Sequence, residues 1–220
     1  MSVTALLMIF YPAISRKVPR KKLMKILLRV ALAGYAIMLV PGVLMHAGAM
    51  KVLGMDLKFL LITIGYMVAN FGQYGYYLIL MISIINTVEY NEYIHGTRDE
   101  SIITSMRPFL TKLASALTVV ITSVTYMLTG VTQYTKEISD LENQAAASAI
   151  TEAEKLSEIH ALLQNVTHGQ AMALLLVMIV LPLALMALSY VLYVKHYTLD
   201  EPEYDRICAE LKVRREGKQA

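Results

Sequence analysis

Tryptophan is absent from this sequence, and cysteine occurs only once, as Cys208. A single cysteine excludes a disulfide within the chain and any metal cluster built from several thiolates. Charged residues are scarce, at 17% of the sequence, whereas soluble domains have about 25%. Because the charges are missing from long continuous blocks, the composition is typical of an all-α membrane protein.

Four apolar segments are long enough to cross a bilayer, which requires about 20 helical residues. Three of them, at 30–50, 59–88 and 170–194, contain no charged residue, and the fourth, at about 100–126, contains Arg107 and Lys112 in its interior. The apolar N-terminus, 1–15, is shorter, and its basic residues follow it, the reverse of a signal peptide. We therefore expect a helical bundle of about four full transmembrane helices and one partial one.

Polar segments separate these helices. The sequence predicts a partial transmembrane helix at 1–15, a cytoplasmic basic loop at 16–23, a transmembrane bundle at 24–194 and a cytoplasmic tail at 195–220. Within the bundle, 131–168 is hydrophilic with recurring apolar positions, which predicts an amphipathic surface helix on the outer side. Sixteen Lys and Arg lie on the side of the basic loop and the tail, and four on the other side. This bias predicts a multi-pass cell-membrane protein with a cytoplasmic C-terminus.

Charges are concentrated where one predicted span ends and the next begins. This stretch, 86–112, holds four acidic and three basic residues. The last of them, Lys112, falls within a predicted span, where a charge costs several kcal/mol unless it meets water or a carboxylate. No apolar run has an Asp or Glu in its interior, so we expect the counter-charge to come from outside these 220 residues. The chain would then be part of a transporter. The alternative is that Lys112 extends to the lipid headgroups.

Polar side chains also follow one face of two predicted spans. On 59–88 they are Tyr66, Asn70, Gln73, Tyr74 and Tyr77, and on the next span they include Thr111 and Ser115 beside Lys112, with Arg107 nearer the cytoplasm. They either bond to neighbouring helices, which Gly65, Gly72 and Gly75 would let approach, or line a wet cavity for a polyhydroxylated solute.

Glu89 and Arg98 lie between these two spans. They could pair with charges on another helix bundle when the cytoplasmic side closes, which suits an alternating-access gate. They could equally be surface charges of a loop, worth less than about 1 kcal/mol each.

The stretch N-T-V-E-Y-N-E-Y-I-H-G-T-R-D-E-S-I after a span, followed by a helix with Lys112, resembles the C-terminal half of the glycoside–pentoside–hexuronide:cation symporters. These are melibiose-permease-like members of the major facilitator superfamily, and the resemblance covers essentially the whole chain. The segment from Glu89 to Glu92 stands at the family's Asp-Tyr-Gly-Glu-like motif, and Arg98, Glu100 and Lys112 match.

The resemblance implies sugar transport coupled to Na⁺, H⁺ or Li⁺. It implies that Lys112 lies by the sugar and cation sites, that Glu89 and Arg98 are cytoplasmic gate residues, and that the cation site lies mainly in an N-terminal half that these residues lack. Asn91 replaces the motif glycine, and Asn86 stands where an aspartate is common. Arg107 and Pro108 stand where the melibiose-type pattern has Gln and Thr. An arginine at this position favours an anionic sugar such as a glucuronide.

The expected partners are therefore a sugar or glycoside, a coupling cation, the N-terminal half of a transporter and membrane lipids. No catalytic constellation, cofactor motif, metal-ligand spacing or nucleic-acid site is found in the sequence. The competing hypothesis is a non-transporting membrane interaction protein or a decayed transporter fragment, which predicts no uptake and tolerance of Lys112→Leu.

Overall fold

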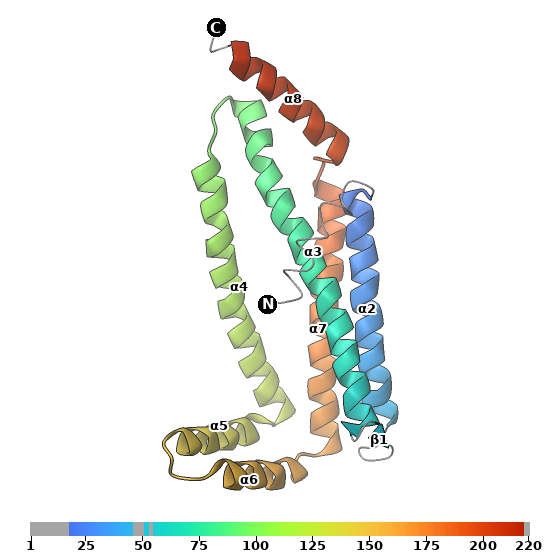
Figure 1. Ribbon diagram of the computed structural model, residues 1–220, viewed down its shortest axis with the longest axis vertical. Coiled ribbons are helices and arrows are strands. Elements are labelled where there is room, and N and C mark those ends of the chain that lie inside the picture. Colours follow the sequence, from blue (N-terminus) through green and yellow to red (C-terminus); the bar gives the residue numbers. More distant parts are fainter. Residues whose placement is uncertain (1–17, 46–50, 53–54, 218–220) are drawn as a thin grey trace. The chain divides into compact units, whose positions relative to one another are not determined.

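The computed structural model describes residues 18–45, 51–52 and 55–217, so the partial span predicted at 1–15 lies outside the described residues. The described chain is helical apart from one short hairpin (Figure 1). Its helices are α2 (Arg20–Leu44), α3 (Leu57–His95), α4 (Glu100–Thr129), α5 (Thr132–Ala146), α6 (Glu152–Gln164), α7 (His168–His196) and α8 (Glu201–Gly217). The strands β1 (Lys51–Val52) and β2 (Met55–Asp56) pair antiparallel.

Four helices, α2, α3, α4 and α7, are long and apolar enough to cross a membrane, which confirms the four predicted spans. The hairpin between α2 and α3 was not predicted. The side chain of Asp56 at its end accepts a hydrogen bond from the Lys58 backbone N–H at 2.8 Å and so caps α3. Helix α2 begins at Arg20, inside the predicted basic loop, because Pro19 disfavours helix in the residue before it.

The helices form two compact units, and the boundary between them falls within α4 and α7. The first unit consists of the described residues up to Thr111 and from Leu181 onward, and the second is Lys112–Val180.

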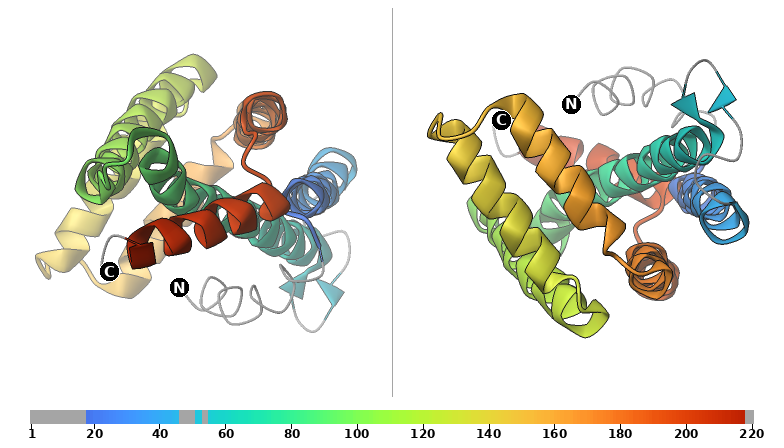
Figure 2. Two further views of the ribbon diagram at one scale, coloured as in Figure 1. Left: turned by 90° about the horizontal axis from the view of Figure 1, so that it is seen from above. Right: turned by 90° about the horizontal axis from the view of Figure 1, so that it is seen from below.

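Helices α2 and α3 lie side by side in the first unit (Figures 1 and 2). A Cβ atom at Gly72 would lie 2.6 Å from the Ala31 nitrogen, and one at Gly65 would lie 2.8 Å from the Gly34 oxygen. Only glycine fits at such a distance, so the predicted close approach of a neighbouring helix is confirmed. The adjoining apolar core is formed by Met24, Leu27, Tyr76, Ile79 and Tyr193.

The second unit contains two surface helices, α5 and α6, in the segment predicted to form one (Figure 2). The chain turns between them, with Ser148 at a φ of 57°. Thr151 then starts α6 with a capping box. Its hydroxyl accepts from the Glu154 N–H at 3.2 Å, and the Glu154 carboxylate accepts from the Thr151 N–H at 2.8 Å. The spacing of apolar residues could not reveal this break, because three-to-five-residue steps tolerate a change of phase.

Candidate functional site at the α3–α4 turn

The turn between α3 and α4 is stabilised by hydrogen bonds among residues of the turn and the end of α3. Gly96 takes a left-handed φ of 73° at the end of α3, and its N–H donates to the Glu92 carbonyl at 2.8 Å. The side chain of Asp99 accepts hydrogen bonds from the Asn91 amide at 3.2 Å and the Thr97 hydroxyl at 3.1 Å. Asn91 therefore holds the turn in shape.

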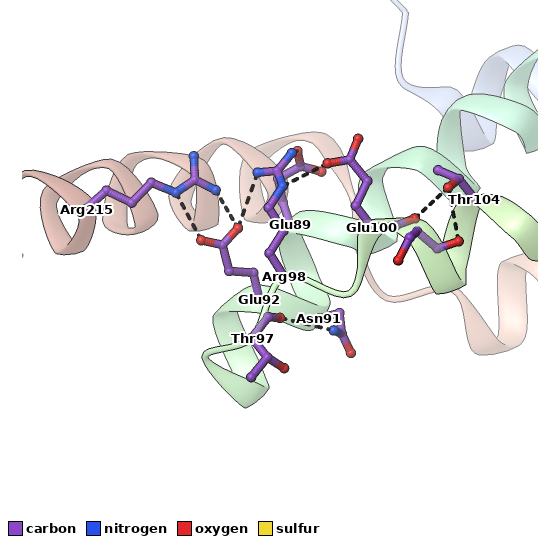
Figure 3. Close-up of polar contacts among 9 residues, drawn as sticks. Glu89, Asn91, Glu92, Thr97, Arg98, Glu100, Thr104 and Arg215 are labelled. Atoms are coloured by element: carbon purple, nitrogen blue, oxygen red, sulfur yellow. Dashed lines mark hydrogen bonds and ion pairs between the residues drawn. The ribbon is translucent and has the colours of Figure 1, made fainter.

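This turn directs Arg98 back along α3 towards three carboxylates (Figure 3). Its guanidinium lies 2.9 Å from Glu100, 3.4 Å from Glu92 and 4.0 Å from Glu89, measured between the nearest nitrogen and oxygen atoms. The pKa of Arg98 is raised above its usual value, chiefly by the hydrogen bond to Glu100. Glu89 and Arg98, predicted as gate residues, thus lie in one charge network, together with Glu92 and Glu100.

The tail helix α8 joins this network through Arg215. Its Nε and Nη2 atoms donate to the two oxygens of Glu92 at 3.0 and 2.5 Å, so Glu92 lies between Arg98 and Arg215 (Figure 3). The pKa of Arg215 is raised above its usual value, chiefly by its hydrogen bond to Glu92. Next to it, the Arg206 and Arg214 guanidinium groups lie 5.7 and 4.8 Å from the centre of the Tyr93 ring.

Glu89 is the least satisfied member of the network. Its Oε1 atom is 4.0 Å from Arg98, which is too far for a hydrogen bond. Its Oε2 atom is buried and accepts no hydrogen bond from the residues that the structure describes. Three carboxylates therefore share two guanidinium groups, and one carboxylate oxygen is left without a donor, which usually requires an explanation such as a missing partner.

A second arginine is held at the start of α2. Arg20 is 5% exposed, and both its backbone N–H and its Nε donate to Glu201 of α8, at 2.6 and 2.9 Å. With the Asn86 amide oriented to satisfy both of its ends, Asn86 accepts from Arg20 and donates to the Ile82 carbonyl at 3.2 Å. Burial acts to raise the pKa of Glu201, but the hydrogen bonds from Arg20 outweigh it and hold that pKa below the usual value.

On the predicted polar face of α3, some side chains form hydrogen bonds within the protein and others are exposed. The Gln73 amide donates to the Tyr35 hydroxyl of α2 at 2.5 Å, which is the helix-bonding alternative for this residue. The Asn70 amide donates to the Tyr66 carbonyl of its own helix at 2.8 Å. Tyr77 is 43% exposed.

The predicted site residues of α4 lie on a helix in which no residue is buried. The Thr111 hydroxyl donates to the Arg107 carbonyl at 2.9 Å, which turns it inward to its own helix. Arg107 and Thr111 belong to the first unit, and Lys112 and Ser115 belong to the second. Within the described residues, Lys112 has no ion pair.

Sequence reasoning missed three participants, Arg20, Glu201 and Arg215. Arg20 falls within the predicted cytoplasmic basic loop, 16–23, but it is a buried hydrogen-bond donor at the start of α2. The signals that could have pointed to them are weak. They are a proline directly before Arg20 and an α8 sequence with acidic residues in its first turn and basic ones in its last.

The described residues therefore form an α-helical protein in which four helices are long and apolar enough to cross a membrane. No family model matches the chain, and neither the curated proteins nor the solved structures contain a match to it. Among the described residues, no group of three or more His, Cys, Asp or Glu side chains could hold a metal ion.

Proposed function

We propose that this chain forms the C-terminal-half bundle of a sugar:cation symporter in the cell membrane, and that it transports together with an N-terminal-half bundle. The observation that carries the proposal is the charge network at the α3–α4 turn. Residues singled out by the resemblance, Glu89, Glu92, Arg98 and Glu100, lie within one set of ion pairs.

The network would act as the cytoplasmic gate. The unpartnered Oε2 atom of Glu89 suits a donor from the second bundle. Arg98 is 42% exposed at its side chain, so it is accessible to such a partner. Forming these contacts in one state and releasing them in the other would give alternating access.

The substrate and coupling residues would face the second bundle. Lys112 has no carboxylate partner among the described residues, and α4 buries none of its side chains, both of which suit a helix that packs against another bundle. Lys112 would neutralise carboxylates of that bundle when the coupling cation, Na⁺, H⁺ or Li⁺, is absent. Asn70, Tyr77, Thr111 and Ser115 would hydrogen-bond sugar hydroxyls, Gln73 would do so with the part of its amide that is not bonded to Tyr35, and Arg107 would favour an anionic sugar.

Uptake by cells tests the proposal. The chain is co-expressed with the N-terminal half of a sugar:cation symporter, and accumulation of labelled glycosides and glucuronides is measured against either half alone. We expect uptake only with both halves, and a loss of at least about tenfold for Arg98→Ala, because Arg98, which is exposed in this bundle, would be desolvated between the two bundles in the closed gate. Lys195→Ala, an exposed charge of α7, serves as the control and keeps full uptake.

No uptake in any combination, with both halves present in the membrane, would favour the competing hypothesis of a non-transporting membrane interaction protein. The same hypothesis predicts that Arg98→Ala leaves binding to the second bundle unchanged.

A further inference from the structure

The α5–α6 hairpin is a part of the second unit that the proposed transport cycle does not use. Helix α4 ends at Thr129 and α5 begins at Thr132, while α6 ends at Gln164 and α7 begins at His168. Both ends of the hairpin are therefore two or three residues from a helix that can cross a membrane. Figure 1 shows α5 and α6 running across the ends of α4 and α7 rather than continuing them.

Hydrogen bonds fix the hairpin in this position. Gly130 adopts a left-handed φ of 69°, and its carbonyl accepts from the Gln170 amide of α7 at 3.1 Å. The Tyr134 hydroxyl of α5 donates to the Asn165 carbonyl after α6 at 3.1 Å. A hairpin held on two such short connections must lie at the level where the spans leave the hydrocarbon.

Helix α6 exposes two leucines on one side, and its other side lines a groove in which carboxylates lie beside Leu141 and Leu162. Leu156 and Leu163 are seven residues apart, so they lie on one side of the helix, and they are 63% and 50% exposed. The other side, with Glu158 and Ala161, lines a groove of about 430 Å³ between α6 and α5. The groove carries two further carboxylates from α5, Glu137 and Asp140.

We propose that α6 lies in the interfacial layer of the phospholipid bilayer, with Leu156 and Leu163 directed to the acyl chains and the acidic groove directed to water. Amphipathic helices in this layer bury their apolar side about 5–10 Å into the headgroup and acyl boundary. The reverse orientation would place three carboxylates, Glu137, Asp140 and Glu158, against lipid, where carboxylates are costly. The proposed orientation places one near the leucines, Glu152 in the first turn of α6, and its charge is paired with Lys155 at 2.6 Å. The occupant of the leucine side is therefore the lipid surface that the two neighbouring spans enter.

The absence of tryptophan from the sequence makes a direct test available. The full chain carrying Leu156→Trp or Leu163→Trp is reconstituted into phosphatidylcholine vesicles, with or without lipid brominated at the upper acyl carbons. We expect brominated lipid to quench at least about half of the fluorescence of each variant. Acrylamide, which is neutral and is not repelled by the acidic groove, should quench each several-fold less than it quenches a water-exposed tryptophan.

Ala161→Trp is the matched control, because residue 161 lies about 140° around the same helix from Leu156 and lines the groove. Its fluorescence should respond to acrylamide and not to brominated lipid. The unsubstituted chain gives a second readout that depends on no tryptophan variant. A lipid carrying a photoactivatable group in its upper acyl chain should label the peptide that contains Leu156 and Leu163.

Two results would overturn the proposal. Equal acrylamide quenching of the leucine-side variants and of Ala161→Trp would place the leucines in water. Protection of those variants from both acrylamide and bromine, with no labelling of the α6 peptide, would mean that another protein surface or a second copy covers them.

Discussion

Arg20 shows how one buried charge can depend on a residue far along the chain. Its side chain is 6% exposed, and its carboxylate partner, Glu201, is 181 residues away. A guanidinium taken out of water must recover hydration energy from hydrogen bonds and an opposite charge. Asn86 supplies an oxygen without a charge, so Glu201 alone supplies the negative charge within the described network. Glu201 thereby attaches α8 to the start of α2.

Substitution of Glu201 should destabilise the protein through the uncompensated charge on Arg20. Glu201→Ala is expected to lower the free energy of unfolding by about 1–3 kcal/mol, less than for a fully buried pair because Glu201 is 34% exposed. Thermal unfolding in detergent micelles measures it. Glu203→Ala, which removes only a surface pair with Arg206, should leave the midpoint unchanged. Equal midpoints for both variants would contradict the dependence of Arg20 on Glu201.

The same carboxylate makes stability depend on pH. Because the pKa of Glu201 is lower in the folded protein than in the unfolded chain, its contribution is complete above the unfolded value of about 4.5 and is lost as the pH falls through the folded value. The difference in midpoint between the native chain and Glu201→Gln should therefore be constant from pH 7 to about pH 5 and narrow below about pH 4. A difference that widened in acid would have the wrong sign for this explanation.

Among the elements, α2 and α3 make close backbone contacts at glycines, next to side-chain packing in the apolar core. Helices in lipid gain little from apolar burial, so close packing across glycines is a principal source of their association. Gly65 and Gly72 of α3 face backbone atoms of α2, whereas Gly75 faces only the side chain of Leu27. The backbone contacts of Gly65 and Gly72 leave no room for a Cβ atom, whereas the Leu27 side chain next to Gly75 can move to make room for one.

Gly72→Ala should separate the two helices and cost about 1–3 kcal/mol, because its Cβ would lie 2.6 Å from the Ala31 backbone nitrogen. Gly75→Ala is the matched control. Its Cβ would lie 2.8 Å from a terminal carbon of Leu27, a flexible side chain that can rotate away. Unfolding of the two variants in detergent should show a clearly lower midpoint only for Gly72→Ala. A larger effect at Gly75 would mean that the contact surface is not the one described.

The stability of helix α6 depends on the capping box in its first turn, because none of its residues is buried and tertiary packing therefore adds little. Thr151→Ala removes the capping box and should destabilise the helix by about 1 kcal/mol, which corresponds to roughly fivefold faster amide exchange across 152–164. Thr132→Ala, at the exposed start of α5, should leave exchange in α5 unchanged, because Val131 precedes that helix without a side-chain cap. Hydrogen exchange followed by mass spectrometry would compare the two, and unchanged exchange in α6 would refute the capping role.

Long apolar runs predicted the spans well, because length and hydrophobicity alone decide whether a helix can cross a bilayer. The spacing of apolar residues did not predict the turn at Ser148, but the T-x-x-E pattern of Thr151 and Glu154, which marks the start of α6, could have done so. For the candidate site, the motif identified Glu89 and Arg98. The contributions of Glu201 and Arg215 could not be predicted, since these residues lie 181 and 123 positions from their partners and follow no sequence period.

At the scale of the whole molecule, the described residues form two compact units. Each unit holds one charged side chain whose partners among the described residues are incomplete. Glu89 keeps a buried oxygen without a donor. Lys112, in a helix able to span a membrane, has no carboxylate partner among the described residues. Both features follow if the chain packs against a second bundle that supplies the complementary groups.

Cation-driven accumulation of sugar tests this account most directly. Membrane vesicles that contain the chain and an N-terminal half of a sugar:cation symporter are prepared with no sugar inside. Uptake of a labelled glycoside is then followed with and without an inward Na⁺, Li⁺ or H⁺ gradient. We expect gradient-dependent accumulation that Lys112→Ala reduces at least about tenfold, since an intramembrane charge pair is worth several kcal/mol, while Lys136→Ala on α5 leaves it unchanged. Full gradient-dependent accumulation by Lys112→Ala would contradict the account.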